Sequence, residues 1–201
     1  MPLYVPAAAS SAALPSIFSA YPRTGVWHGP SIDVAADGAI IALVDGEERA
    51  VPFIVAAAGT IDRIGVKTSG TVGGTGSVIR LGIRNDASGY PGSTVVLDAG
   101  TVVGTANGDL NIAVSQALPA GLYWLTCTSQ GGASPQPSVH SQPIGTNRLT
   151  IVGGTAQANI QNPAWSNATA PIQTSISGAL PSSWTGTSRT SYYPLLAVRW
   201  A

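Results

Sequence analysis

The side chains that most often carry chemistry are scarce and widely separated in this chain of 201 residues. Its only histidines, His28 and His140, lie in two different predicted loops, and its only cysteine is Cys127. A zinc site usually needs three or four His, Cys or carboxylate ligands, a set that these residues do not supply. One cysteine cannot form an internal disulfide, and the alternating run around Cys127 predicts a small, buried apolar side chain. We therefore expect no metal site.

Four aspartates are candidates by residue type for acid and base catalysis, namely Asp62, Asp86, Asp98 and Asp109. Glycoside hydrolysis needs two carboxyl groups flanking one sugar, but each aspartate is explained as a turn or strand-end residue. Asn85-Asp86 with Ser88 could offer oxygens to calcium, yet too few acids are nearby and a plain turn is favoured. The sequence has no Gly-x-Ser-x-Gly, Walker-type or His-Glu-x-x-His motif. We predict a protein that is not an enzyme and uses no cofactor.

Tryptophan is the distinctive residue type, with five copies. Trp27, Trp165 and Trp184 lie among Gly, Pro, Ser and Thr, which places them in predicted loops. Exposed aromatic rings anchor protein interfaces, and they also stack on sugar rings. Burial between subunits is the favoured interpretation for these three, and saccharide stacking is the alternative. Trp124 and Trp200 lie in strand-like runs and are predicted in the core.

Composition excludes some partners. Charged residues are only 9% of the chain, against roughly a quarter in an average globular protein, and the net charge is zero. Without a basic run there is no electrostatic footprint for nucleic acid. No stretch approaches the roughly 20 apolar residues of a membrane span, so we expect no membrane insertion. A surface with few charges suits close contact between subunits, because little charge must be desolvated on assembly.

Alternation with period two is the main structural signal. Ile79, Leu81 and Ile83 fall on one face of a predicted strand, while Arg80 and Arg84 fall on the other, expected to meet solvent or a partner. Residues 110–115 repeat the pattern. Residues 122–127 are predicted as a central strand with Leu122 and Trp124 in the core. Asp45-Gly46 and Asn107-Gly108 are hairpin signals.

These elements predict an all-β protein, a β-sandwich or jelly roll with an irregular N-terminal arm. The arm covers residues 1–30, is broken by prolines, and is expected to attach the protein or contact another subunit. It lacks a basic stretch, so it does not read as a signal peptide. The sandwich covers residues 31–201, with long loops at 129–147 and 153–190.

Several segments then resemble a known module. They are Thr60-Ile61-Asp62-Arg63-Ile64, Arg80-Leu81-Gly82-Ile83, Gly89-Tyr90-Pro91-Gly92, Asp98-Ala99-Gly100-Thr101-Val102 and the run from Leu118 to Leu125. In order and spacing this resembles a β-sandwich module of minor tail proteins, tail fibres and head-associated proteins of tailed bacteriophages. The resemblance covers roughly residues 50–132. The ending, Tyr192-Tyr193-Pro194 followed by residues 196–200, is also similar.

The resemblance implies a structural subunit located in the virion, as capsid decoration or as a minor tail or tail-tip protein. It implies assembly with copies of itself, a trimer being favoured, and contact with major capsid or tail proteins. The alternative hypothesis is a host-adsorption module whose loops bind saccharide of the host envelope. A long repetitive stalk, usual in tail fibres, is absent from the sequence.

Overall fold

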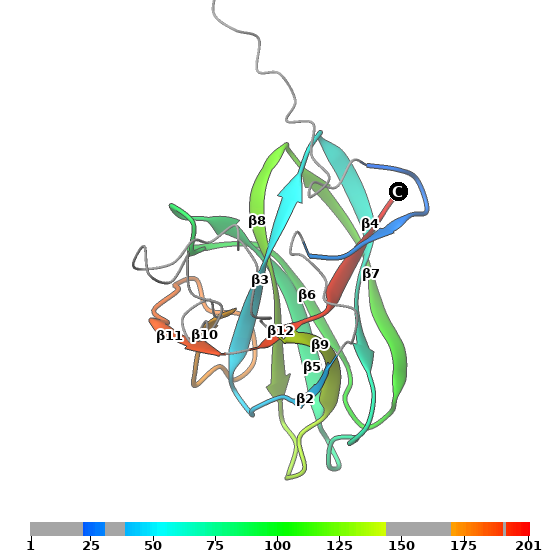
Figure 1. The fold of residues 1–201 in the computed structure, drawn as a ribbon, viewed down its shortest axis with the longest axis vertical. Helices are drawn as coiled ribbons and strands as arrows, with labels where there is room; N and C mark the ends of the chain where they lie inside the picture. The colour runs from blue at the N-terminus through cyan, green and yellow to red at the C-terminus, as the bar shows by residue number, and fades with distance from the viewer. Residues whose placement is uncertain (1–21, 31–38, 144–169, 191) are drawn as a thin grey trace, which may run out of the picture.

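The computed structural model describes residues 22–30, 39–143, 170–190 and 192–201, and these residues form strands and turns without any helix. The strands make two antiparallel sheets that pack face to face (Figure 1). The predicted all-β sandwich is confirmed, and the jelly-roll topology stays a prediction. Within the described residues there is no helix of the length and apolar character that crossing a membrane requires.

Both ends of the described chain lie in the seven-stranded sheet. Its strand order is β1 (Trp27–His28), β13 (Leu196–Trp200), β4 (Gly59–Thr68), β9 (Ser138–Pro143) and β12 (Tyr192–Pro194), with β7 (Gly108–Leu118) beside β4 and β2 (Ala39–Ala42) beside β9. The six-stranded sheet has the order β11 (Ser188–Thr190), β10 (Ala170–Gln173), β3 (Glu48–Val55), β8 (Gly121–Gln130), β5 (Val78–Asp86) and β6 (Pro91–Val103).

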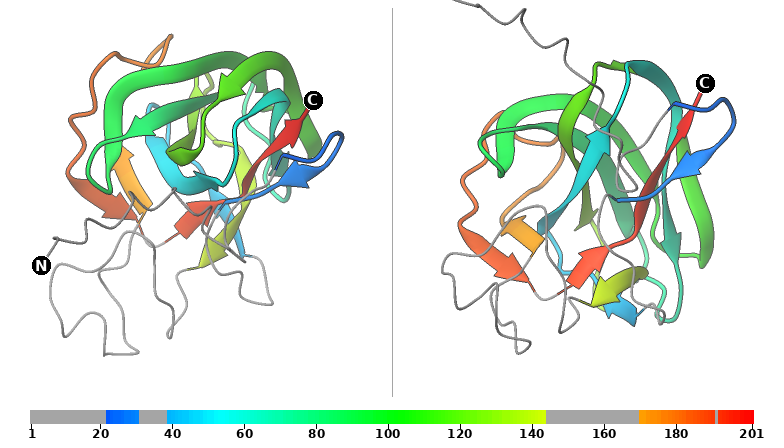
Figure 2. Two further views of the ribbon diagram at one scale, coloured as in Figure 1. Left: turned by 90° about the horizontal axis from the view of Figure 1, so that it is seen from above. Right: turned by 45° about the horizontal axis from the view of Figure 1, so that its top comes forward.

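The last part of the predicted N-terminal arm belongs to the sandwich. Trp27 and His28 form β1 and pair with Arg199 and Val198 of β13. Figure 2 shows β1, in blue, beside the red C-terminal strand. The arm prediction is therefore wrong for these residues, because an edge position on β13 supplies the backbone partners that the sequence alone does not reveal. Residues 1–21 of the predicted arm lie outside the described residues.

The core between the sheets follows the period-two pattern. Ile79, Leu81 and Ile83 of β5 are fully buried there, as predicted. Leu125 and Cys127 of β8 lie in the same cluster. Trp200 also joins this core, as predicted, and its indole stacks on Phe53 with ring centroids 6.4 Å apart.

Trp124 is buried, but on the opposite face of its sheet from the one expected. It alternates with the core residues Leu125 and Cys127 and lies in register with Arg84 on the outer face of the six-stranded sheet. Leu122 shares this outer face and is only half-buried, so its predicted place in the core is wrong. The physical reason is the pleat: a strand sends successive side chains to opposite faces, and here both faces are covered.

The outer face is covered by residues 174–187, which we call the covering segment. Figure 2 shows it in orange on the outside of the sandwich, between β10 and β11. It buries Arg84 completely, so the expectation that the arginine face of β5 meets solvent or a partner is wrong for Arg84. The second half of the predicted loop at 153–190 therefore contains β10, the covering segment and β11. Residues 153–169 of that loop lie outside the described residues.

Two predicted hairpins are turns between the sheets. Asp45-Gly46 joins β2 to β3, and Asn107-Gly108 joins β6 to β7, strands that do not pair with each other. Gly46 has a φ of 67°, which suits a tight turn. This conformation does not determine whether the two flanking strands pair with each other. The predicted loop at 129–147 is also shorter than expected, since β8 ends at Gln130 and β9 begins at Ser138.

Candidate binding groove on the seven-stranded sheet

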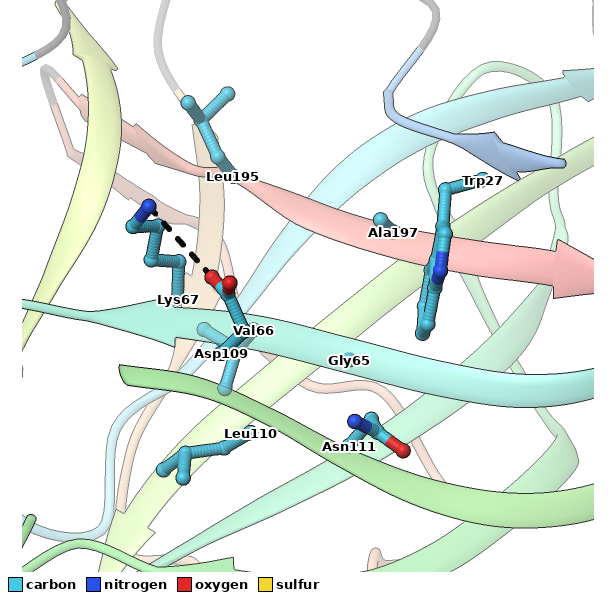
Figure 3. Close-up of a pocket in the computed structure, with 9 residues that line it drawn as sticks. All are labelled: Trp27, Gly65, Val66, Lys67, Asp109, Leu110, Asn111, Leu195 and Ala197. Carbon is cyan, nitrogen blue, oxygen red and sulfur yellow. Dashed lines mark ion pairs between the residues drawn. The ribbon is translucent and has the colours of Figure 1, made fainter. Parts of the chain in front are cut away.

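An open groove of about 360 Å³ lies on the outside of the seven-stranded sheet. Its walls come from β1, β4, β7 and β13, so it forms only when the N- and C-terminal strands join the central ones (Figure 3). Most of the lining is apolar and includes Leu110, Leu195 and Ala197. The groove is therefore an apolar surface depression with a limited number of polar groups.

Trp27 is the one aromatic residue among the described residues that line the groove, and 43% of its surface is exposed. Its indole reaches from β1 past Ala197 toward Gly65 (Figure 3). A Cβ atom on Gly65 would lie 3.3 Å from Cη2 of the indole and only 2.9 Å from the carbonyl oxygen of Leu110. The glycine thus leaves room for the ring to lie close to β4 while part of it stays open to solvent.

Three polar side chains stand along β4 and β7 at one side of the groove. Nζ of Lys67 lies 3.6 Å from Oδ1 of Asp109, and both side chains are exposed, by 56% and 81%. Asn111 is the neighbouring outward residue on β7, and its Oδ1 accepts a hydrogen bond of 2.7 Å from Nη1 of Arg63. This bond fixes the orientation of the amide, so Asn111 can offer the Nδ2 donors and the second lone pair of Oδ1.

An ion pair stands on the same sheet next to Trp27. Arg199, the register partner of Trp27, donates from Nε and Nη2 to the two carboxylate oxygens of Asp62, at 2.9 and 2.5 Å. The hydrogen bond from Arg199 holds the pKa of Asp62 below its ordinary value despite partial desolvation, and the same bond raises the pKa of Arg199. Both charges are therefore already compensated, which leaves Lys67 and Asp109 as the looser charged pair.

Three of the four aspartates considered for catalysis accept hydrogen bonds, and the fourth, Asp109, lies 3.6 Å from Nζ of Lys67. Asp62 binds Arg199, and Asp109 faces Lys67. Asp98 accepts from Arg80 at 2.6 Å and from the Leu180 N–H at 3.0 Å. Asp86 accepts from the Trp124 indole at 2.9 Å and from the Gly89 N–H, as a turn residue does. Among the residues that the structure describes, no three His, Cys, Asp or Glu side chains are grouped as metal ligands would be.

The two predicted loop tryptophans that the structure describes, Trp27 and Trp184, do not form one site. Trp27 lines the groove, whereas Trp184 lies in the covering segment on the other sheet, and Trp165 lies outside the described residues. The Trp184 indole is half-buried over the Arg84 guanidinium, 5.4 Å from its carbon to the ring centroid, and Nε1 donates to the Gly186 carbonyl. Its visible role is thus inside the subunit.

A buried polar cluster beneath the covering segment is not predicted from the sequence. Arg84 donates to both carboxylate oxygens of Glu48, at 2.8 and 3.0 Å, and Gln173 donates to Glu48 at 2.6 Å. Glu48 and Arg84 are fully buried and Gln173 is 3% exposed. The three come from β3, β5 and β10, so no local motif announces them. Lys67 and Asn111 were likewise missed; their outward places in alternating strands were the available signal.

The remaining candidates for chemistry lie apart. His28 is on β1 with a pKa lowered chiefly by burial, and His140 is on β9. Cys127 is fully buried, as predicted, and burial raises its pKa to about 12. At neutral pH its thiol is therefore protonated and a poor nucleophile.

No protein-family model matches this sequence, and a search of curated proteins finds no significant match.

Proposed function

We propose that the protein is a structural, non-enzymatic subunit of a tailed-phage virion, acting as capsid decoration or as a minor tail protein. It assembles with copies of itself, as a trimer by analogy with the module it resembles, and attaches to capsid or tail proteins. The resembling segments between residues 60 and 125 lie in the consecutive strands β4–β8 and the turns between them, which contribute to both sheets.

The open edge of β7 supports the assembly part of this proposal. Among the described strands, β7 pairs only with β4, so one side of its 11-residue backbone is free of a ladder. Natural edge strands usually carry Lys, Pro or bulges that prevent pairing with another chain. β7 has no Lys, Arg or Pro. Asp109 near its start is exposed and charged, and its other exposed residues, Asn111, Ala113, Ser115 and Ala117, are small and neutral. Such an edge suits strand addition by another subunit.

Comparison with the other long edge strand, β6, favours β7 as the edge that pairs with another subunit. β6 is also an outer strand, but its pairing with β5 has three register shifts, whereas the pairing of β7 with β4 has one. Such bulges twist an edge away from further pairing. Five of the nine basic residues are compensated within the subunit, because Arg49, Lys67, Arg80, Arg84 and Arg199 are each in an ion pair, which limits the charge that opposes association.

Two measurements test the proposal. Light scattering of the full chain should give a mass near three times the 20.3 kDa subunit, and Ser115→Lys on the β7 edge should shift it toward monomer. Thr105→Lys, an equal charge in the exposed turn after β6, is the matched control and should leave the mass unchanged. A wild-type chain that stays monomeric at high concentration would contradict assembly.

The virion assignment needs particles. Mass spectrometry and antibody labelling of particles purified from the encoding phage should find the protein at the capsid or the tail. A copy number in the hundreds means capsid decoration, whereas a few copies mean the tail. Protein present in the lysate and absent from purified particles would refute the assignment.

A further inference from the structure

We infer that the groove beside Trp27 binds a neutral saccharide through one or two pyranose rings. This goes beyond the structural role proposed above and does not depend on it, because the groove lies within one subunit.

The indole of Trp27 supplies a stacking surface. An aromatic face carries partial negative charge, and the C–H groups on one face of a pyranose carry partial positive charge, so the two surfaces attract while water is displaced. The ring is 43% exposed and stands beside the apolar side chains of Leu195 and Ala197. Gly65 beneath it keeps the groove deep enough for a ring to enter.

The polar groups at the side of the groove match hydroxyls better than a charged ligand. Asn111 offers its Nδ2 donors, because its Oδ1 already accepts a hydrogen bond from Arg63, which fixes the amide orientation. Nζ of Lys67 and Oδ1 of Asp109 are 3.6 Å apart, too far for a good hydrogen bond between them, so Lys67 keeps its donors and Asp109 keeps its acceptors. A sugar hydroxyl donates and accepts at once, and vicinal hydroxyls could engage both groups. Asp109, the more exposed of the two, disfavours an acidic sugar by repulsion.

The same groups argue against an apolar side chain of a partner protein as the occupant. Such a side chain would cover Lys67, Asp109 and Asn111 without replacing their bonds to water, and uncompensated polar groups are costly to bury. A polyol replaces those bonds. The volume of about 360 Å³ is at the lower end of the roughly 300–1,000 Å³ typical of small-molecule sites, which suits a mono- or disaccharide.

The experiment titrates full-length protein with neutral disaccharides (cellobiose, maltose, lactose and chitobiose) at millimolar concentrations, followed by NMR of the indole N–H signals. At least one sugar should bind and shift the Trp27 signal. Trp27→Ala should weaken binding at least tenfold, and Asp109→Ala should weaken it several-fold while keeping the stacking ring. Tyr192→Ala, an exposed aromatic on the same sheet outside the groove lining, is the matched control and should bind as wild type.

The outcomes separate this inference from the assembly proposal. Ser115→Lys should lose assembly and keep saccharide binding, so either result can fail alone. No binding of any neutral sugar, unchanged binding in a folded Trp27→Ala variant, or binding only of acidic probes such as glucuronate would each overturn the inference. Loss of particle attachment in Trp27→Ala, with no sugar bound by wild type, would instead assign the groove to a protein partner.

Discussion

Arg84 of β5 and Glu48 of β3 form a two-point ion pair across β8, with both side chains completely buried outside the core between the sheets. Arg84 also donates to the Pro181 carbonyl at 3.0 Å, and Trp184 lies over its guanidinium. The pair therefore joins the six-stranded sheet to the covering segment. Burying two charges is costly, and the bonds from Gln173 and to Pro181 show how that cost is offset here.

Removing one partner of this pair should be strongly destabilising. Arg84→Met leaves the Glu48 carboxylate buried without its counter-charge, and we expect the free energy of unfolding to fall by about 3–5 kcal/mol. Urea denaturation followed by circular dichroism measures this. Lys67→Met in the exposed pair with Asp109 is the control and should cost about 1 kcal/mol or less. Equal effects of the two variants would mean that Arg84 is hydrated in solution.

The outer-face position of Trp124 gives a second prediction. Trp124→Ala should lower the free energy of unfolding by about 3–5 kcal/mol, because it empties a fully buried aromatic site. Trp124→Phe keeps most of the volume and loses the hydrogen bond to Asp86, so it should cost less. Chemical denaturation compares the two. A cost below about 1 kcal/mol for Trp124→Ala would show that the covering segment does not shield the indole.

The period-two pattern predicted the inner faces well and the outer faces poorly. Ile79, Leu81 and Ile83 were placed correctly, because alternation is a local property of the strand. Arg84 was misplaced because its partners, Glu48 and Pro181, are 36 and 97 residues away in the sequence. An arginine on the strand face opposite the apolar residues predicts that this face is exposed to solvent, unless a segment distant in sequence covers it. No local sequence signal indicates that residues 174–187 cover this face.

The groove could be predicted only in part. The type and surroundings of Trp27 indicate a binding residue. Its position in the groove, however, depends on the pairing of β1 with β13, two strands at opposite ends of the described chain. Lys67 and Asp109 become neighbours through the β4–β7 register. The hairpin signal at Asn107-Gly108 suggested pairing of β6 with β7 instead, and a turn motif fixes a reversal without fixing which strands pair.

Acid should loosen the covering segment through Asp98. Burial alone would raise the pKa of this carboxyl, but hydrogen bonds from the Leu180 N–H and from Arg80 outweigh it and hold the pKa below the ordinary 3.8. A lowered pKa in the folded state means that the contribution is complete above the unfolded value. It is lost as the pH falls through the folded pKa, so stability should drop below about pH 4.

Hydrogen exchange at the Leu180 amide, measured against pH, checks this locally. Protection should decline at acid pH in the wild type and be lower and less pH-dependent in Asp98→Asn. Amides of β8 in the core serve as the internal reference. Protection at Leu180 that stays constant through acid pH would show that Asp98 does not anchor the segment.

Gly82 should be needed for the covering segment to pack closely on the six-stranded sheet. A Cβ atom at this position would lie 2.3 Å from Cδ1 of Leu180 and 2.8 Å from the backbone oxygen of Leu97. The leucine can rotate, but the backbone of β6 cannot yield as readily, so Gly82→Ala should cost about 1–3 kcal/mol, as overpacked sites do. It should also increase acrylamide quenching of Trp184, since Leu180 and Trp184 belong to the same segment.

Gly121→Ala in neighbouring β8 is the control, because its Cβ would meet only Tyr123, at an ordinary 3.7 Å. If both variants melt alike and Trp184 stays equally shielded, the covering segment does not rest on Gly82.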